Sequence, residues 1–210
     1  MDLDEVDGLT NWEEMYTQKL IRRLKRNSLK RAVALLSAAA TNTAKTWDTT
    51  AAKDPDQDVL LELIAGADLS GIRPNRVGYG DTSWSKRMLS HRAQNTAGGF
   101  ASSALTPDVL AGLLQVDAVN VCPSRYTASA TARTQIIANL VLMFLAESGV
   151  DTEDASNIKR FVTMGSSTQG GGVYQVYAQR VSAKRYVIAV GTYELTKIVS
   201  TLGIRQFTIS

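Results

Sequence analysis

His91 is the only histidine in this 210-residue chain, so any general acid–base chemistry would have to be centred on it. Ser90 precedes it without the glycine pattern of a nucleophile elbow. The single cysteine, Cys122, lies between Val121 and Pro123 with no adjacent base to activate its thiol. We therefore expect a surface or satisfied histidine and a small buried cysteine. An enzyme built on Ser90, His91 or Cys122 is the least supported of three function hypotheses.

Two other patterns resemble ligand-binding motifs. Asp54, Asp56 and Asp58 alternate like calcium ligands, but the glycine and bidentate glutamate of a calcium loop do not follow at the right distance. Helix capping explains them better. The run Gly170-Gly171-Gly172 lacks the Lys-Ser or Lys-Thr of a phosphate-binding loop, which favours a loop between strands. The sequence thus predicts no catalytic residue, no cofactor and no metal site.

The strongest electrostatic feature is a sharp charge asymmetry near the start of the chain. Residues 1–14 carry six acids and no base, whereas residues 19–31 carry seven bases and no acid. Such bases can neutralise DNA phosphates without reading sequence, but a solvated helix face gives the same pattern. Both interpretations stay open, since Arg22 and Arg23 point in different directions on a helix. The candidate DNA-facing residues are Lys19, Arg22, Arg23, Lys25, Arg26, Lys30 and Arg31.

Composition limits the broader function classes. A hydrophobic content of 44% excludes a wholly disordered chain and suffices for one large domain or two small lobes. The formal net charge of +3 is too small for a dedicated nucleic-acid binder. No apolar run reaches the roughly 18 residues that a membrane span needs, so we expect no membrane contact.

Helices are expected mainly in the first half of the chain. Thr10 and Glu13 form a capping box that starts a helix running to about Ala40. Asp54 followed by Pro55, and Thr106 followed by Pro107, are cap-then-proline signatures of two further helices. A fourth helix is expected to be capped by Asp81 and to carry Trp84, Met88 and Leu89. Residues 41–54 are expected to form a loop that Trp47 anchors. Gly98 and Gly99 are expected to mark another loop.

Strands are expected mainly in the second half. The turn Arg73-Pro74-Asn75 leads into a short strand at 76–79, and the tail 195–209 is ambiguous between strand and helix. The fold class is therefore α+β, with helices followed by an antiparallel sheet. The other predicted strands are 116–121, 136–146, 160–164, 173–181 and 185–190.

The order of motifs between Lys45 and His91 resembles tailed-bacteriophage major capsid proteins of the Hong Kong 97 type. A Trp-Asp loop and a proline-started helix are followed by a Gly-x-x-Pro-Asn turn, a strand and a helix ending near Leu-x-His. The similarity covers roughly residues 16–210. The residues that carry it are Trp47, Asp48, Pro55, Gly71, Pro74, Asn75 and Trp84.

The resemblance implies a structural, self-assembling protein and not an enzyme. It implies a long spine helix with linker at 11–45 after an acidic segment at 1–10, and mixed axial and β-rich peripheral domains within 46–210. Hexamers and pentamers would form the icosahedral head of a phage or prophage around double-stranded DNA. The protein would be made in the host cytoplasm and located in the virion. It would contact other copies of itself and scaffold, portal or cement proteins.

One departure and two alternatives accompany this interpretation. Family members have an N-terminal arm and an extended β-hairpin before the spine helix, whereas an acidic segment of about ten residues precedes it here. The chain is then a shortened relative, a fragment, or a protein whose arm is encoded elsewhere. The alternatives are a nanocompartment shell protein of the same fold, and a DNA-binding accessory protein that uses the basic helix 19–31.

Overall fold

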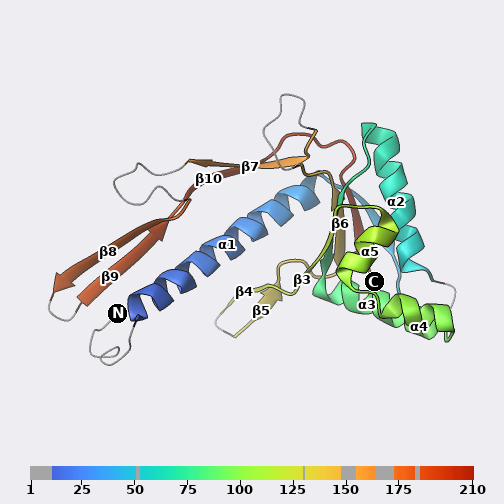
Figure 1. The fold of residues 1–210 in the computed structure, drawn as a ribbon, viewed down its shortest axis with the longest axis horizontal. Helices are drawn as coiled ribbons and strands as arrows, with labels where there is room; N and C mark the ends of the chain where they lie inside the picture. The colour runs from blue at the N-terminus through green and yellow to red at the C-terminus, as the bar shows by residue number, and fades with distance from the viewer. Residues whose placement is uncertain (1–10, 51–52, 130, 148–154, 164–172, 183–184) are drawn as a thin grey trace. The chain divides into compact units, whose positions relative to one another are not determined.

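The computed structural model describes residues 11–50, 53–129, 131–147, 155–163, 173–182 and 185–210 (Figure 1). The chain forms two compact units. Unit 1 comprises Met1–Arg31 with Arg160–Thr196, and unit 2 comprises Ala32–Lys159 with Lys197–Ser210. Both units contain segments that are distant in the sequence, so neither corresponds to a continuous stretch of chain.

The first helix, α1, spans Trp12–Ala39 and confirms the long helix predicted from the sequence. Its 28 residues correspond to about 42 Å of helix. The predicted cap Thr10 lies outside the described residues. The helix belongs to unit 1 up to Arg31 and to unit 2 from Ala32 onward.

Unit 2 is built on a five-stranded sheet with the order β1-β11-β6-β2-β3. The sheet is mixed: β1 pairs with β11 and β2 with β3 in parallel, while β6 pairs antiparallel with β11 and β2. The second-half strands β6 and β11 pair antiparallel as predicted, and each parallel pair includes a strand from the first half. The strands span Thr41–Lys45 (β1), Arg76–Gly80 (β2), Ala118–Cys122 (β3), Leu140–Phe144 (β6) and Arg205–Ile209 (β11).

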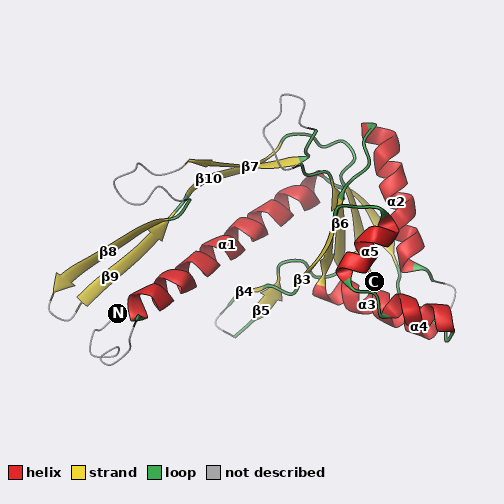
Figure 2. Ribbon diagram, viewed as in Figure 1, coloured by secondary structure: helices red, strands yellow, loops and turns green. Residues whose placement is uncertain are grey.

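Helices cover one face of this sheet (Figure 2). Alternate strand residues, such as Val77 and Tyr79 on β2, point toward Leu63 of α2 and Leu110 of α5, and all four are fully buried. On the other face, Leu142 of β6 packs with Val33 near the end of α1. The helices are α2 (Pro55–Ser70), α3 (Asp81–Ala93), α4 (Ala97–Ser103) and α5 (Pro107–Leu114).

Two of the predicted helix starts are confirmed by their caps. The Asp54 carboxylate accepts hydrogen bonds from the backbone N–H groups of Asp56 and Gln57 at the start of α2. The Thr106 hydroxyl accepts from the backbone N–H of Val109 at the start of α5. In both helices proline follows the cap, where its missing N–H costs no hydrogen bond.

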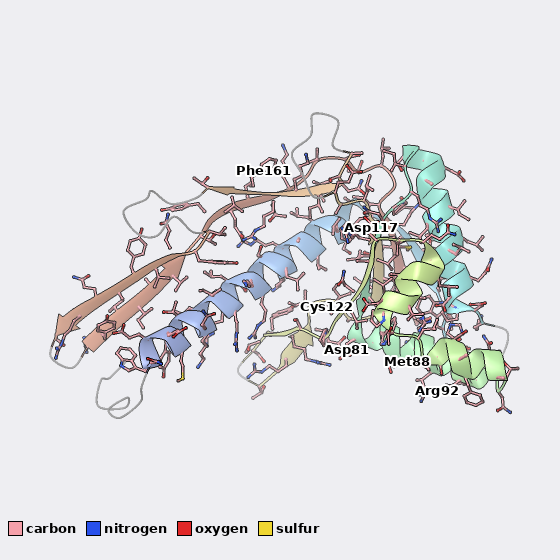
Figure 3. All side chains as sticks on the ribbon, in the orientation of Figure 1. Asp81, Met88, Arg92, Asp117, Cys122 and Phe161 are labelled. Carbon is pink, nitrogen blue, oxygen red and sulfur yellow. The ribbon has the colours of Figure 1, made fainter. Side chains whose placement is uncertain are left out.

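Three local predictions are wrong. Gly80 is the cap residue of α3. Asp81, labelled in Figure 3, instead forms an ion pair with Arg125; the two atoms lie 2.6 Å apart. Gly98 and Gly99 lie within α4, whose cap is Thr96. Residues 41–45 form strand β1, because pairing with β11 overrides their weak local signal.

Unit 1 combines the first part of α1 with strands that are not part of the large sheet. A hairpin of β8 (Gln175–Ser182) and β9 (Arg185–Gly191) pairs antiparallel, with an irregularity between Arg180 and Ser182. Strands β7 (Ile158–Thr163) and β10 (Tyr193–Ile198) form a second two-stranded sheet. A further short hairpin, β4 (Arg125–Thr127) with β5 (Arg133–Gln135), belongs to unit 2. The glycine run 170–172 lies outside the described residues.

Candidate nucleic-acid interface

Five of the seven candidate bases share one face of α1. Because a helix turns by about 100° per residue, these five fall within an arc of about 100°. Arg22 and Arg23, whose directions differ, mark the two edges of the same arc. All five side chains are exposed. We call this set the basic face: Lys19, Arg22, Arg23, Arg26 and Lys30.

The half-buried residues of α1 in unit 1 explain why this face is exposed. Tyr16, Leu20, Leu24 and Ser28 recur four residues apart and are all partly buried. On the helical wheel Leu20, Leu24 and Ser28 lie about 110° or more from the centre of the basic face, and Tyr16 lies beside its Arg23 edge. The basic face is therefore the solvent side of an amphipathic helix segment.

The other two candidate bases lie outside the basic face and have partners within unit 1. The Lys25 ammonium lies 5.9 Å from the centre of the Tyr174 ring. Arg31 donates to the Glu194 carboxylate at 3.2 Å. Lys25 and Arg31 are thus less suited to contact phosphates than the basic face is.

The arginines of the basic face are free of ion pairs to the described residues. Arg22, Arg23 and Arg26 form none within that part of the chain, and the Lys19 ammonium lies 5.7 Å from the Tyr16 ring centre. Exposed, uncompensated cations within one arc are what sequence-independent phosphate binding requires. This arrangement can bind a polyanion but carries no group that would read base edges.

Glu194 organises the remaining charges of unit 1. Arg160 donates to its carboxylate through Nε at 2.7 Å and also pairs with it through Nη2. Burial alone would raise the pKa of Glu194, but hydrogen bonds from Arg160 and Ser28, with the charges of Arg160 and Arg31, lower it overall. The Glu194 carboxylate therefore stays ionised and connects β10, β7 and α1.

A groove in unit 1 borders the basic face. It has a volume of about 390 Å³, and the Trp12 and Tyr186 rings meet edge to face at one side with centroids 5.2 Å apart. A hydrogen bond to Glu13 raises the pKa of Tyr186 above its usual value. We call it the α1–β9 groove; its lining residues are Trp12, Tyr16, Lys19, Leu20, Arg23, Tyr186, Val187 and Ile188.

The motif residues predicted from the sequence all lie in unit 2, where they make structural contacts. Trp47 is buried, as predicted, and its Nε1–H donates to Asp58 at 2.9 Å. Asp48 accepts from the backbone N–H of Thr50, which lowers the pKa of Asp48. Pro55 occupies the first position of α2. These contacts position the loop before α2 rather than a reactive group.

The glycine, proline and asparagine of the Gly-x-x-Pro-Asn turn have separate structural roles. Gly71 ends α2 with φ of 74°, a left-handed conformation that glycine adopts without strain. Pro74 packs directly against Gly66 of α2. The Asn75 amide donates to Ala146 O at 3.1 Å and accepts from Ala146 N at 2.9 Å. This turn therefore fixes the entry into β2.

A buried charge cluster in unit 2 was missed by sequence reasoning. Arg87 donates to both oxygens of Asp56, at 2.6 and 2.7 Å, and His91 Nε2 lies 3.1 Å from Asp56 Oδ2. The Arg87 guanidinium also lies 4.9 Å from the Trp84 ring centre. Asp56 was assigned to helix capping, but its carboxylate holds α2 against α3.

The environment of this cluster shifts two pKa values. Burial alone would raise the pKa of Asp56, but interactions with His91 and Arg87 and their charges lower it overall. Burial, followed by the Asp56 charge, raises the pKa of Tyr79. His91 is thus buried beside Asp56, but its Nε2 meets the geometry of no hydrogen bond among the described residues, so the predicted satisfied histidine is not confirmed. The four-residue spacing of Arg87 and His91 on a helix is the signal that could have indicated a shared partner.

The other residues considered for catalysis are not brought together around a reactive centre. Ser90, which precedes His91 in the sequence, is fully buried. Cys122, labelled at the end of β3 in Figure 3, is half-buried, so the prediction of a buried cysteine is wrong. Asp58 pairs with Lys45 at 2.7 Å and does not act as a cap.

Among the described residues, no group of three or more His, Cys, Asp or Glu could hold a metal ion. No described helix is long and apolar enough to cross a membrane.

Comparison with known proteins identifies the fold. No protein-family model matches the chain, and no curated protein matches it by sequence. A phage-related protein from Bordetella bronchiseptica RB50 superposes with a TM-score of 0.69 and 17% identity over 91% of this chain. A chain provisionally assigned as the capsid protein of an Escherichia coli CFT073 prophage gives a TM-score of 0.43 and 13% identity, covering 79% of this chain and 50% of its own. This chain spans 64% of the Bordetella protein and shares the fold of that phage-related protein.

Proposed function

We propose that the chain is a shell subunit of a tailed-phage capsid of the Hong Kong 97 type, forming hexamers and pentamers around double-stranded DNA. In this proposal α1 is the spine helix, unit 1 contributes to the peripheral domain and unit 2 to the axial domain. The fold shared with a phage-related protein supports the proposal, as does the motif order from Trp47 to Trp84.

The observation that carries the proposal is the outward apolar surface of α2 and α5. Leu61 and Leu69 of α2 are 54% and 57% exposed, and Val109 and Leu113 of α5 are 56% and 58% exposed. The opposite sides of both helices are packed in the core of unit 2. Exposed apolar side chains that gather on neighbouring helices are typical of surfaces that a partner protein covers. Neighbouring subunits would supply that cover and bury this surface from water.

The test compares assembly of three forms of the full chain by negative-stain electron microscopy and light scattering, across concentration and salt. The unchanged chain is expected to form rings of five or six, sheets or closed shells. Leu61→Gln with Leu113→Gln should block assembly without changing the thermal midpoint, because both side chains are exposed. Gln57→Asn with Asp108→Asn, on the same helices, should assemble normally. A chain that stays monomeric in every condition contradicts the proposal.

The basic face supports a second element of the proposal, contact with the enclosed genome. Arg22→Glu with Arg26→Glu should lower the affinity of the chain for duplex DNA and reduce the slope of log affinity against log salt by about 2. Arg92→Glu with Arg133→Glu, an equal charge change on exposed residues of unit 2, should leave both nearly unchanged.

The outcomes also separate the alternatives. Shells that retain DNA equally with and without the Arg22 and Arg26 changes would contradict a genome-facing basic face. Shells that retain no DNA in either form would favour a nanocompartment. Steeply salt-dependent DNA binding by monomers that never assemble would instead favour the accessory-protein interpretation.

A further inference from the structure

The α1–β9 groove combines an apolar floor with two cations, Lys19 and Arg23. Trp12, Leu20 and Ile188 supply apolar surface from α1 and β9. Arg23 has no ion pair among the described residues, and Lys19 is exposed. A ligand that fits this groove must therefore carry negative charges interspersed with apolar groups.

We infer that the groove binds the acidic N-terminal segment of its own chain, residues 2–7. In this segment the acids Asp2, Asp4, Glu5 and Asp7 alternate with Leu3 and Val6, and no base occurs. The carboxylates complement Lys19 and Arg23, and the two apolar side chains complement the floor of the groove. The inference requires neither assembly nor DNA, so it stands apart from the proposed function.

The length of chain available makes this contact within one chain feasible. The described chain begins at Asn11, next to Trp12 at one end of the groove. Arg23 lies eleven positions after Trp12, or about 17 Å along the helix. The ten residues before Asn11 reach about 33 Å when extended. Because the segment is tethered at the groove, its effective concentration there is on the order of millimolar.

Binding of the segment has a direct consequence for the basic face. Lys19 and Arg23 belong to both the groove and the basic face. A carboxylate paired with either side chain occupies a cation that a phosphate would otherwise contact. The acidic segment therefore competes with any polyanion for part of the basic face.

Disulfide trapping in the full chain tests this contact. With Cys122→Ser removing the native thiol, Leu3→Cys and Val187→Cys place thiols on the segment and on an exposed groove residue. A disulfide forms only when the two Cα atoms approach within about 7 Å. We expect rapid closure within one chain at low salt, seen as thiol loss and a shifted monomer band on a non-reducing gel.

The matched control keeps the same tether and removes only the charges. Asp2→Asn, Asp4→Asn, Glu5→Gln and Asp7→Asn should slow closure roughly five- to tenfold, the effect of about two exposed ion pairs. Reversing the cations with Lys19→Glu and Arg23→Glu should slow it further, because like charges then face each other. Combining that reversal with Asp2→Lys and Asp4→Lys should restore the rate. Closure at the same rate in all four forms, or a disulfide that links two chains, would overturn the inference.

Discussion

The two units of the molecule differ in where their apolar side chains lie. Every buried residue in the described part of the chain belongs to unit 2, including Trp47, Leu63 and Phe207. Within the described residues of unit 1, no apolar side chain is buried, and Val181 and Leu195 are 61% and 60% exposed. Unit 2 therefore contains its own hydrophobic core, whereas unit 1 depends on helix α1, strand pairing and exposed charge pairs.

Each unit also contains one carboxylate held by arginine, and these two sites allow a direct comparison. Asp56 and Arg87 in unit 2 are both nearly inaccessible to solvent. In unit 1, Glu194 is paired with Arg31 and Arg160, whose side chains are 60% and 40% exposed. The Glu194 side chain is itself only 3% exposed, so the contrast between the sites lies in their arginines. Solvent screens the exposed guanidiniums of Arg31 and Arg160, and the same chemistry should therefore contribute different free energies.

The largest expected effect is the loss of the buried carboxylate. Asp56→Ala leaves the Arg87 guanidinium buried without its counter-charge and should lower the free energy of unfolding by about 4 kcal/mol. Glu194→Ala removes a screened pair and should cost less than about 1 kcal/mol. Urea unfolding of both variants measures the difference. Equal losses would show that the two sites are not distinguished by burial.

The second comparison removes the same apolar atoms from each unit. Leu63→Ala opens a cavity in the core of unit 2 and should lower the free energy of unfolding by about 3 kcal/mol. Leu195→Ala removes an exposed side chain from β10 and should change it by less than about 0.5 kcal/mol. Guanidinium unfolding checks both values. A large effect at Leu195 would mean that unit 1 has a core of its own.

The third comparison adds a methyl group at a glycine in each unit. A Cβ on Gly80 would lie 2.6 Å from the Ile137 carbonyl oxygen and against the Ala138 carbonyl. Gly80→Ala should therefore lower the free energy of unfolding by about 2 kcal/mol. A Cβ on Gly191, in β9, meets nothing within 4 Å, so Gly191→Ala should be neutral. Thermal midpoints of the two variants test this contrast.

The smallest effect concerns pH. The folded state lowers the pKa of Asp56 below its usual 3.8 and that of Glu194 below its usual 4.5. Each carboxylate therefore stabilises the fold above its unfolded pKa, and this contribution is lost as pH falls through the folded value. Urea midpoints should fall from about pH 5 downward. Asp56→Asn should flatten this dependence more than Glu194→Gln; an unchanged slope in both would contradict these assignments.

Local signals in the sequence were sufficient for the main helices. Asp54 with Pro55 and Thr106 with Pro107 predicted where α2 and α5 begin, and apolar spacing predicted α1. In each case, the residues that determine the element are near neighbours in the chain. The motif residues Trp47, Gly71 and Asn75 also lie at well-defined structural positions.

Features that depend on distant contacts could not be predicted from the sequence. Strand β1 consists of Thr41–Lys45, whose polar side chains give no strand pattern, and it forms because β11 pairs with it. The Asp56–Arg87 pair joins residues 31 positions apart. The partners of Lys25 and Arg31, which set these two bases apart from the basic face, lie on strands or loops distant in the sequence.

The parallel pairing of β1 with β11 has a consequence for the timing of folding. Gln206 of β11 bonds to Asn42 of β1 across 164 positions, and β11 lies inside the sheet between β1 and β6. During synthesis, β1 and β6 emerge from the ribosome long before the strand that separates them. Closure of such a loop is slow, and the partial sheet exposes strand edges meanwhile. Unit 2 thus cannot complete its sheet, nor offer a finished surface to a neighbour, until residues 205–209 have been made.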